Sequence, residues 1–273
     1  MVNHILNCIH FYWFTMLHSL HTKKIAVALI AAMTVFFTGC GLLDSDSNDP
    51  NQKLGGNTKL DYTNVGDKFS ASIDIIPYPL NEHINDSITV TKNENGDVTI
   101  LVHYTFDTTL VRGLDTLLGT QDFSEELRAS IRNYYINKYE ISVDTSNPDN
   151  IRVWKEIKLR ATSDGIQEYV SSKGNTSKPF TVIRYNANVG DKYEFTNAEG
   201  EKLLRTVVYH STTDDYEMAF WRIKVFKTEE YMQNDPMISK ITYITNHKFG
   251  LVAIEIDTKD GKHVPVTIWP PNF

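Results

Sequence analysis

The feature that most constrains this chain is a two-residue alternation of apolar and polar side chains. It recurs in eight segments rich in threonine, valine, isoleucine and aromatic residues. This period is that of a β-strand with one buried and one wet face, and such strands pair antiparallel. The segments predicted to be strands are Val98–Phe106, Ile151–Leu159, Phe180–Tyr185, Leu203–Tyr209, Met218–Phe226, Ile238–Ile244, Leu251–Ile256 and Val264–Trp269. We therefore expect a mainly β fold, with an antiparallel sandwich or barrel-like sheets.

One helix, at about residues 123–136, is expected to interrupt this pattern. Its apolar face is expected to contain Phe123, Leu127, Ile131 and Tyr134, which recur at helical spacing. Asp122 followed by Glu125 forms a candidate capping box. We expect the helix to pack against one end of a sheet. A lid over a cavity and a helix lying on a membrane are the alternatives, and the latter would favour a polar face rich in lysine.

A short motif occurs twice in the chain. Tyr62–Phe69 (Tyr-Thr-Asn-Val-Gly-Asp-Lys-Phe) returns as Tyr185–Tyr193 (Tyr-Asn-Ala-Asn-Val-Gly-Asp-Lys-Tyr). Further on, Thr89-Val90 corresponds to Thr206-Val207. Two related half-units would explain the repetition. The other interpretation is that the same turn-into-strand chemistry is used twice, with glycine free to adopt a positive φ.

The N-terminal segment has the order of a secretory signal. Lys23 and Lys24 precede an uncharged, almost wholly apolar run, residues 25–37, and small residues connect that run to Cys40. Phe37-Thr38-Gly39-Cys40 resembles the lipobox of bacterial lipoproteins, although leucine is preferred where Phe37 stands. The resemblance implies cleavage before Cys40, attachment of diacylglycerol to its thiol, and acylation of its new amino group. Cys40 is therefore the predicted lipid-attachment residue.

Two alternatives to a lipoprotein signal are an uncleaved membrane anchor and simple cleavage with release. Residues 25–43 carry no charge and approach the length of about 20 residues that spans a bilayer. The bulky and lysine-free stretch before Met16 favours Met16 as the start of translation. The predicted organisation is a signal peptide over residues 1–39, a lipidated tether over 40–60, and a single β-rich exported domain over 61–273.

Charge and cysteine content limit the partners of the exported part. The chain has 27 basic and 34 acidic residues, and residues 1–39 remove two lysines and no acid, so the mature charge is 25 − 34 = −9. A negative net charge argues against nucleic acid as a partner, because phosphates require a basic surface. The two cysteines are Cys8, in the discarded segment, and Cys40. The exported domain is therefore expected to have no disulfide and no thiolate metal site. No cofactor is predicted for it.

No motif in residues 41–273 identifies catalysis or metal binding. The five histidines of this part lack the spacing of metal ligands. The most suggestive cluster is His210–Tyr216 (His-Ser-Thr-Thr-Asp-Asp-Tyr), which we expect to be a polar loop rather than an acid–base or cation site. Trp154, Trp221 and Trp269 are candidates to line a carbohydrate or lipid cavity, and packing between strands is the other interpretation.

The exported part is similar to uncharacterised β-rich lipoproteins of Bacteroidetes-like bacteria, and Asn246–Val252 (Asn-His-Lys-Phe-Gly-Leu-Val) adds to the likeness. The resemblance implies no activity. The sequence predicts a cell-envelope lipoprotein, and the absence of aspartate after Cys40 favours the outer membrane. Its predicted role is non-catalytic binding of a hydrophobic ligand, a glycan or an envelope protein. The alternative is an envelope hydrolase acting on a glycan or ester, with catalytic residues dispersed along the chain.

Overall fold

The computed structural model describes residues 49–73, 84–110, 123–197 and 199–271. These residues divide into two compact units, which are described separately. Unit 1 contains residues 84–86, 103–110 and 123–155 of the described chain. Unit 2 contains residues 49–73, 87–102, 156–197 and 199–271. The single domain expected over residues 61–273 stays a prediction.

Unit 2 consists mainly of β-strands, as the alternation predicts. Its strands are β1 (Lys68–Ile73), β2 (Ile84–Glu94), β3 (Asp97–Phe106), β5 (Ile151–Thr162), β6 (Gly165–Glu168), β7 (Phe180–Arg184), β8 (Lys192–Thr196), β9 (Lys202–His210), β10 (Tyr216–Met218), β11 (Trp221–Ile223), β12 (Phe226–Tyr231), β13 (Ile238–Asn246), β14 (Gly250–Thr258) and β15 (His263–Trp269). Of these, β2, β3 and β5 also contribute residues to unit 1. A short 3₁₀ turn, Val170–Ser172, follows β6.

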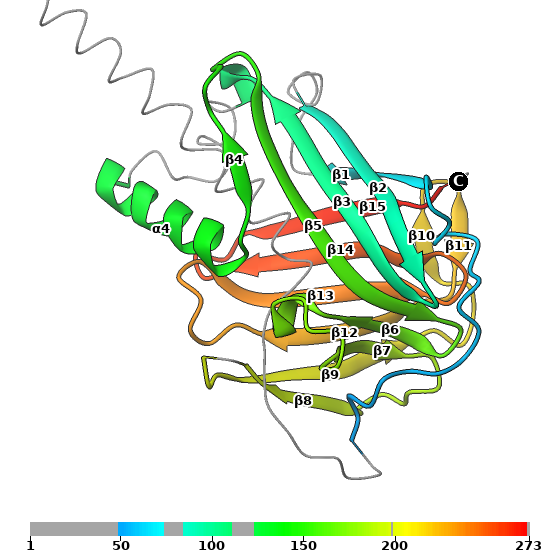
Figure 1. Cartoon of the computed structure of the whole chain (residues 1–273). Coiled ribbons are helices and arrows are strands. Elements are labelled where there is room, and N and C mark those ends of the chain that lie inside the picture. The colour runs from blue at the N-terminus through cyan, green and yellow to red at the C-terminus, as the bar shows by residue number, and fades with distance from the viewer. Residues whose placement is uncertain (1–48, 74–83, 111–122, 198, 272–273) are drawn as a thin grey trace, which may run out of the picture. The chain divides into compact units, whose positions relative to one another are not determined.

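The strands of unit 2 join in the order β7-β6-β5-β3-β2-β1-β15-β14-β13-β12-β9-β8 (Figure 1). The pairings whose register is described are antiparallel. The two ends of this order, β7 and β8, come together: the rings of Phe180 and Phe195 stack with centroids 4.7 Å apart. The backbone N–H of Arg184 also donates to the hydroxyl of Tyr193 at 3.2 Å. The sheet is therefore a nearly closed barrel, which confirms a mainly β, barrel-like fold.

The repeated motif adopts the same structure in both places. Gly66 and Gly190 have φ of 95° and 99°, and each donates its N–H to a valine carbonyl, Val90 or Val207, at 2.8 Å. Each valine N–H donates back to the aspartate carbonyl of the motif at 2.9 Å. Because a side chain with a Cβ disfavours this backbone conformation, glycine is needed at both turns.

The repetition extends to the order of the strands. Lys68 of β1 pairs with Thr89 of β2, and Lys192 of β8 pairs with Thr206 of β9 in the same register. In chain order β1, β2, β3, β5, β6 and β7 form one meander, while β8, β9, β12, β13, β14 and β15 form a second. Insertions fall at different places, between β3 and β5 in the first and between β9 and β12 in the second. Two related half-units therefore describe the sheet.

The segment before β1 fills the junction between β7 and β8. The side chain of Asn51 is buried; its Nδ2 donates to the carbonyl of Glu194 at 2.6 Å, and its Oδ1 accepts the N–H of Thr181 at 3.0 Å. Leu54 is also buried, and its N–H donates to Oε1 of Gln167 at 2.9 Å. Residues 50–60, which the sequence analysis assigns to a tether, are thus part of unit 2. These residues look like a tether in the sequence because they are polar. In the structure, the side chain of Asn51 forms hydrogen bonds with backbone groups of β7 and β8, which form no ladder with each other in the described strands.

Unit 1 contains the helix α4 (Glu125–Lys138) and the short strand β4 (Ser142–Asp144), which pairs with the start of β5. The helix confirms the predicted one within two residues. Its N-cap is Ser124, whose Oγ accepts the N–H of Leu127 at 3.3 Å, so the predicted cap at Asp122 is wrong. The buried face also differs: Ile131 and Tyr135 are buried, whereas Leu127 is 46 % exposed.

One predicted strand, Met218–Phe226, is wrong. The chain turns at Ala219 and Phe220, so that Met218 pairs with Trp221 in the hairpin β10–β11, and Phe226 begins β12. Ala219 has a φ of 51°, a left-handed conformation that no residue type in this stretch signals. The alternation of apolar and polar residues continues through the turn, which conceals it in the sequence.

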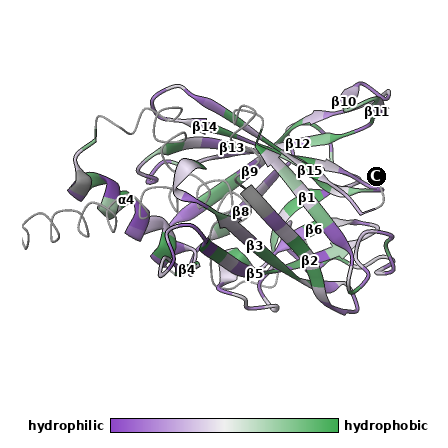
Figure 2. Ribbon diagram, turned by 90° about the horizontal axis from the view of Figure 1, so that it is seen from above, coloured by the Kyte–Doolittle hydropathy of each residue, from purple (hydrophilic) through white to green (hydrophobic). Residues whose placement is uncertain are grey.

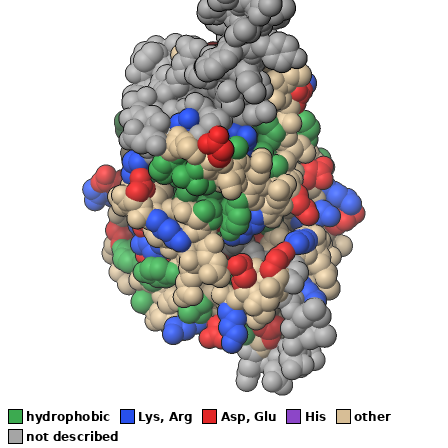
Figure 3. Space-filling model, turned by 90° about the vertical axis from the view of Figure 1, so that its left-hand side faces the viewer, with side chains coloured by type: hydrophobic (Ala, Val, Ile, Leu, Met, Phe, Trp, Pro, Cys, Tyr) green, Lys and Arg blue, Asp and Glu red, His purple; other side chains and the backbone are tan. Residues whose placement is uncertain are grey.

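Hydrophobic and hydrophilic residues alternate along many strands, and the hairpin β10–β11 stands out from the other strands of unit 2 (Figure 2). On the face drawn in Figure 3, lysine and arginine side chains lie interspersed with aspartate and glutamate, among small hydrophobic groups. The interior of unit 2 holds the inward-facing aliphatic and aromatic side chains. Burial of this apolar area is the main contribution to its stability.

The role of Asn51 at the junction is testable by Asn51→Ala. The substitution leaves the Thr181 N–H and the Glu194 carbonyl without this partner, so we expect a loss of about 2–3 kcal/mol in the free energy of unfolding in urea. The matched control is Gln52→Ala, whose side chain is exposed and which should change that free energy by less than about 0.5 kcal/mol. Equal effects of the two substitutions would contradict the role assigned to the Asn51 amide.

Candidate functional site

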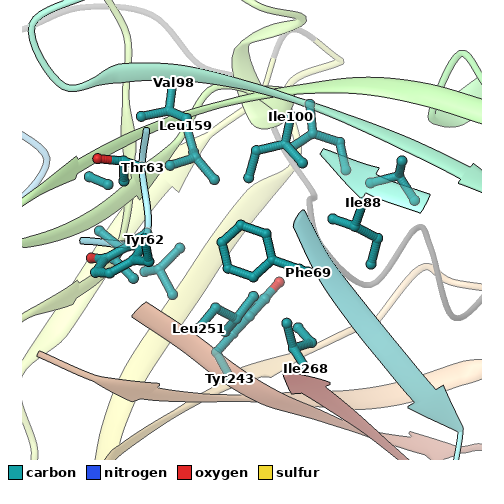
Figure 4. A pocket seen from close by; sticks show the side chains of 15 residues that line it. Tyr62, Thr63, Phe69, Ile88, Val98, Ile100, Leu159, Tyr243, Leu251 and Ile268 are labelled. Carbon is teal, nitrogen blue, oxygen red and sulfur yellow. The ribbon is translucent and has the colours of Figure 1, made fainter. Parts of the chain in front are cut away.

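An apolar cavity of about 70 Å³, partly open to solvent, lies inside the barrel of unit 2. The inward alternation of the strands places aliphatic side chains from both half-units around it. In Figure 4 the ring of Phe69 lies near the centre, with Ile100 and Leu159 on one side and Leu251 and Ile268 on the other. Phe69, Ile100, Leu159 and Leu251 are only half-buried although they point inward, so the barrel interior is incompletely filled at this place.

The few polar atoms of the cavity wall belong to hydroxyl groups. Tyr62, Thr63 and Tyr243 contribute them, and the remaining lining side chains are hydrocarbon. Burial raises the pKa of Tyr62 and of Tyr243, so both hydroxyls stay neutral. The wall therefore suits an uncharged, apolar occupant.

Tyr243 also connects the cavity to a buried cluster of charges centred on Arg205. Its hydroxyl lies 3.4 Å from Nη2 of Arg205 and donates to Oε2 of Glu230 at 3.3 Å. Nε of Arg205 donates to the same Oε2 at 2.8 Å, and Nη2 donates to Oε1 of Glu168 at 3.2 Å. The guanidinium lies 3.7 Å from the centre of the Phe180 ring. Arg205, Glu168 and Glu230 have fully buried side chains.

The cluster reaches across the junction of β7 and β8. Nη1 of Arg205, on β9, donates to the carbonyl of Thr181 on β7 at 3.3 Å. Glu168, at the end of β6, accepts the N–H of Ser171 at 2.8 Å and also the hydroxyl of that serine. Six groups from five strands and one turn thus satisfy each other, as buried charges require.

Burial raises the pKa of Glu168 to about 8, although Arg205 acts in the opposite direction. Two carboxylates share one guanidinium, so a proton on Glu168 leaves the cluster with one positive and one negative charge. Such a neutral arrangement lowers the cost of excluding water. The geometry therefore describes a closed structural cluster, since neither carboxylate has surface that a substrate could reach.

The sequence candidates do not assemble into a site. Cys40 lies outside the described residues, so lipid attachment stays a prediction. Asp215 accepts hydrogen bonds from the hydroxyls of Tyr209 and Ser211, the latter at 2.5 Å, which makes His210–Tyr216 a hydrogen-bonded loop. The ring of His210 stacks on Phe226 at 4.1 Å.

The three tryptophans lie apart from the cavity wall. Trp269 packs against the cluster of Met218, Ile244 and Val252, Trp154 belongs to unit 1, and Trp221 is 65 % exposed. The cavity is lined instead mainly by aliphatic residues of the strands. Their inward alternation was visible in the sequence, but nothing in it indicates that the interior is underfilled.

Within the described residues, no group of three or more histidine, cysteine, aspartate or glutamate side chains is arranged to hold a metal ion. In the same residues, no helix has both the length and the apolar character to cross a bilayer.

Comparison with known proteins gives little further information. No protein-family model and no curated protein matches this chain. Among solved structures, it is similar to a Bacteroides fragilis protein provisionally described as exported and as having a YmcC-like fold. The identity is 8 %, the TM-score is 0.36, and the match covers 76 % of this chain and 95 % of that one. This neighbour fits the Bacteroidetes-like resemblance loosely, and a similarity of this size carries no argument about function.

The protonation of Glu168 gives a pH prediction. A folded pKa near 8, above the ordinary 4.5, stabilises the fold fully below about pH 4.5, and this contribution is lost as pH rises toward 8. We expect the stability difference between the native chain and Glu168→Gln to fall steadily from pH 5 to pH 8, measured by urea unfolding. Parallel stability curves for the two proteins would contradict a protonated Glu168.

The companion variant is Glu230→Gln, which removes the carboxylate that Nε of Arg205 contacts at 2.8 Å. Leaving a buried charge without a partner costs about 3–5 kcal/mol, and we expect a smaller loss here because Glu168 remains beside Arg205. Glu168 should then ionise to accompany Arg205, so the pH dependence expected of the native chain should be smaller in this variant.

Proposed function

We propose that this protein is an exported envelope lipoprotein, anchored through Cys40, whose unit 2 binds the apolar end of a ligand without catalysing a reaction. The observation that supports binding is the apolar cavity inside the barrel, with half-buried Phe69, Ile100, Leu159 and Leu251 in its wall. A water molecule is poorly stabilised in such a cavity because each buried water needs two to four polar partners. Replacing that water by an alkyl group is therefore favourable.

The size of the cavity sets the kind of ligand. At about 70 Å³ it is smaller than the ~150 Å³ cavity that accommodates benzene, and far below the ~300 Å³ of sites for whole drug-sized molecules. A complete lipid does not fit. The end of an alkyl chain does, with the polar head remaining outside the barrel.

The geometry of the buried carboxyl groups supports catalysis less than it supports binding. A hydrolase of glycans requires two carboxyl groups about 5–10 Å apart on either side of a bound sugar. Glu168 and Glu230 instead contact one guanidinium and have no exposed side-chain surface. A non-catalytic role follows more directly from this geometry.

The binding proposal is testable with a series of 1-alkanols from butanol to decanol, titrated calorimetrically. Each methylene that enters the cavity contributes about 0.8 kcal/mol, or about a fourfold gain in affinity. We expect this gain up to a definite chain length and a plateau beyond it. A constant weak affinity across the series would contradict the proposal.

A matched pair of substitutions localises the binding. Leu159→Trp places a larger ring in the cavity wall and should move the plateau to shorter alkanols. Leu204→Trp makes the same change at a position that is 40 % exposed on β9 and outside the cavity lining, and should leave the series unchanged.

The anchor is tested separately. Cys40→Ser removes the proposed acceptor of diacylglycerol, so it should abolish incorporation of labelled palmitate in the native host. Cys8→Ser, in the segment expected to be discarded, should leave incorporation unchanged and serves as the control. Undiminished labelling of Cys40→Ser would contradict the anchor and leave the cavity proposal standing.

A further inference from the structure

The wall of the apolar cavity consists of strands at all but one place. Of the fifteen described residues that line it, thirteen belong to β-strands, and the other two are Tyr62 and Thr63. In Figure 4 these two residues lie together at one side of the cavity. A wall made of paired strands opens only where several backbone hydrogen bonds break together. The place without a strand is therefore the one where the wall opens most easily.

The two lining residues outside the strands belong to a segment that crosses one end of the barrel. We call this segment, residues 57–65, the strap; Figure 1 shows it in blue beside the ends of several strands. Asn57 contacts Ser163 in the β5–β6 turn, and the ring of Tyr62 packs against Gly250 at the β13–β14 turn. Both turns lie at the same end of the barrel, since a hydrogen bond of 3.1 Å joins the chain after β7 to the end of β13 beside them. The strap therefore forms the cavity wall at this end.

Three hydrogen bonds between described residues join the strap to the barrel. Asn57 and Ser163 form two of them: the N–H of Asn57 donates to Oγ of Ser163 at 2.9 Å, and the N–H of Ser163 donates to the carbonyl of Asn57 at 2.8 Å. In the third, Nδ2 of Asn93 donates to the carbonyl of Thr63 at 2.9 Å. The N–H and hydroxyl of Thr63 donate to the carbonyl of Leu60, inside the strap itself. A segment with so few bonds to its surroundings opens locally at a lower free energy than paired strands.

Tyr62 is the large buried side chain that the strap contributes to the cavity wall. Its ring packs closely on Gly250, where a Cβ would come within 2.7 Å of the ring. Its hydroxyl lies beside that of Tyr185, but no hydrogen bond of normal geometry joins the two. Outward movement of Tyr62 therefore breaks apolar contacts without breaking a side-chain hydrogen bond.

A glycine flanks the strap on each side. Gly56 has a φ of 81° and Gly66 has a φ of 95°. Because glycine has no Cβ, it accepts large changes of φ and ψ, and segments that move as a unit commonly turn about a few such residues. The strap is thus bounded by two positions at which the backbone can rotate.

We propose that the strap is the gate of the cavity: it moves outward between Gly56 and Gly66, and the displacement of Tyr62 widens the opening for the alkyl end of the ligand. This inference rests on the binding role in the proposed function and is independent of the lipid anchor. The polar head of the ligand then remains outside the barrel at the end that the strap crosses.

Val98 offers a probe of this movement. It lines the cavity, is 1 % exposed, and packs in the same cluster as Tyr62, so a reagent reaches it only when Tyr62 moves away. Val207 on β9 is a matched control, since it is 0 % exposed and lies outside the described lining of the cavity. A thiol at position 98 should react through opening of the strap, and a thiol at 207 only through wider unfolding.

The experiment uses the complete chain with Cys8→Ser and Cys40→Ser, which leaves the introduced cysteine as its only thiol. Val98→Cys and Val207→Cys are each treated with methyl methanethiosulfonate, and the rate of modification is followed by mass spectrometry. We expect Val98→Cys to react at least about tenfold faster than Val207→Cys, because local opening is more frequent than wider unfolding. Saturating 1-hexanol should slow the reaction of Val98→Cys, since the bound alkyl group occupies the cavity.

A second substitution assigns the opening to the strap. Ser163→Ala removes the acceptor of the Asn57 N–H and should raise the rate at Val98→Cys about fivefold, which corresponds to the loss of one hydrogen bond of about 1 kcal/mol. Ser177→Ala is the control, because this exposed serine donates one hydrogen bond at 2.7 Å in the β6–β7 connection, at the other end of the barrel. It should leave the rate unchanged.

The outcomes separate the gate from the binding role. Equal rates at positions 98 and 207, or equal effects of Ser163→Ala and Ser177→Ala, would overturn the gate, and protection by 1-hexanol would then still support binding. Rates that respond to Ser163→Ala without any protection by 1-hexanol would contradict alkyl binding in the cavity, and with it the use of this opening by a ligand.

Discussion

The structure depends on how the two edge strands of its sheet are protected. A strand at the edge of a sheet presents unpaired N–H and carbonyl groups, which invite pairing with another chain. In unit 2 these edges are β7 and β8, and they meet without a hydrogen-bonded ladder between them in the described strands. The Asn51 amide occupies the gap and bonds to one backbone group on each side. A single side chain therefore forms hydrogen bonds of the kind that a backbone peptide group would form in a fully closed barrel.

The two half-units explain why only one junction needs this device. Each is a six-stranded meander that begins with the same glycine turn and the same strand register. Approximate symmetry makes the β1–β15 junction the counterpart of β7–β8. The first is closed by backbone pairing from Ser70 with Trp269 to Ile73 with Val266. The second is closed by side chains, so the symmetry is broken at the place where the N-terminal segment enters.

The sequence predicted the features that follow from local periodicity. Seven of the eight predicted strands are present because alternation along a single strand is a local property. The eighth, Met218–Phe226, contains a turn at Ala219 and Phe220, and alternation continued across it. Asn51 and Leu54 look like tether residues because their contacts lie more than a hundred residues away. The cavity was likewise not predictable, since underfilling depends on how side chains from many strands pack together.

The buried charges are best understood as part of the same closure. Replacing a buried ion pair by hydrophobic residues is often neutral for stability, so stability alone does not explain Arg205, Glu168 and Glu230. Unlike hydrophobic contacts, their hydrogen bonds are directional. Arg205 on β9 bonds to the Thr181 carbonyl on β7, to Glu168 on β6 and to Glu230 on β12. Hydrophobic contacts would tolerate a shift of β7 by two residues, because such a shift keeps the same face inward. A shifted β7 would leave the guanidinium with an unsatisfied donor in a dry interior, which is costly. The cluster therefore fixes the register at the one junction of the barrel that lacks a ladder among its described strands.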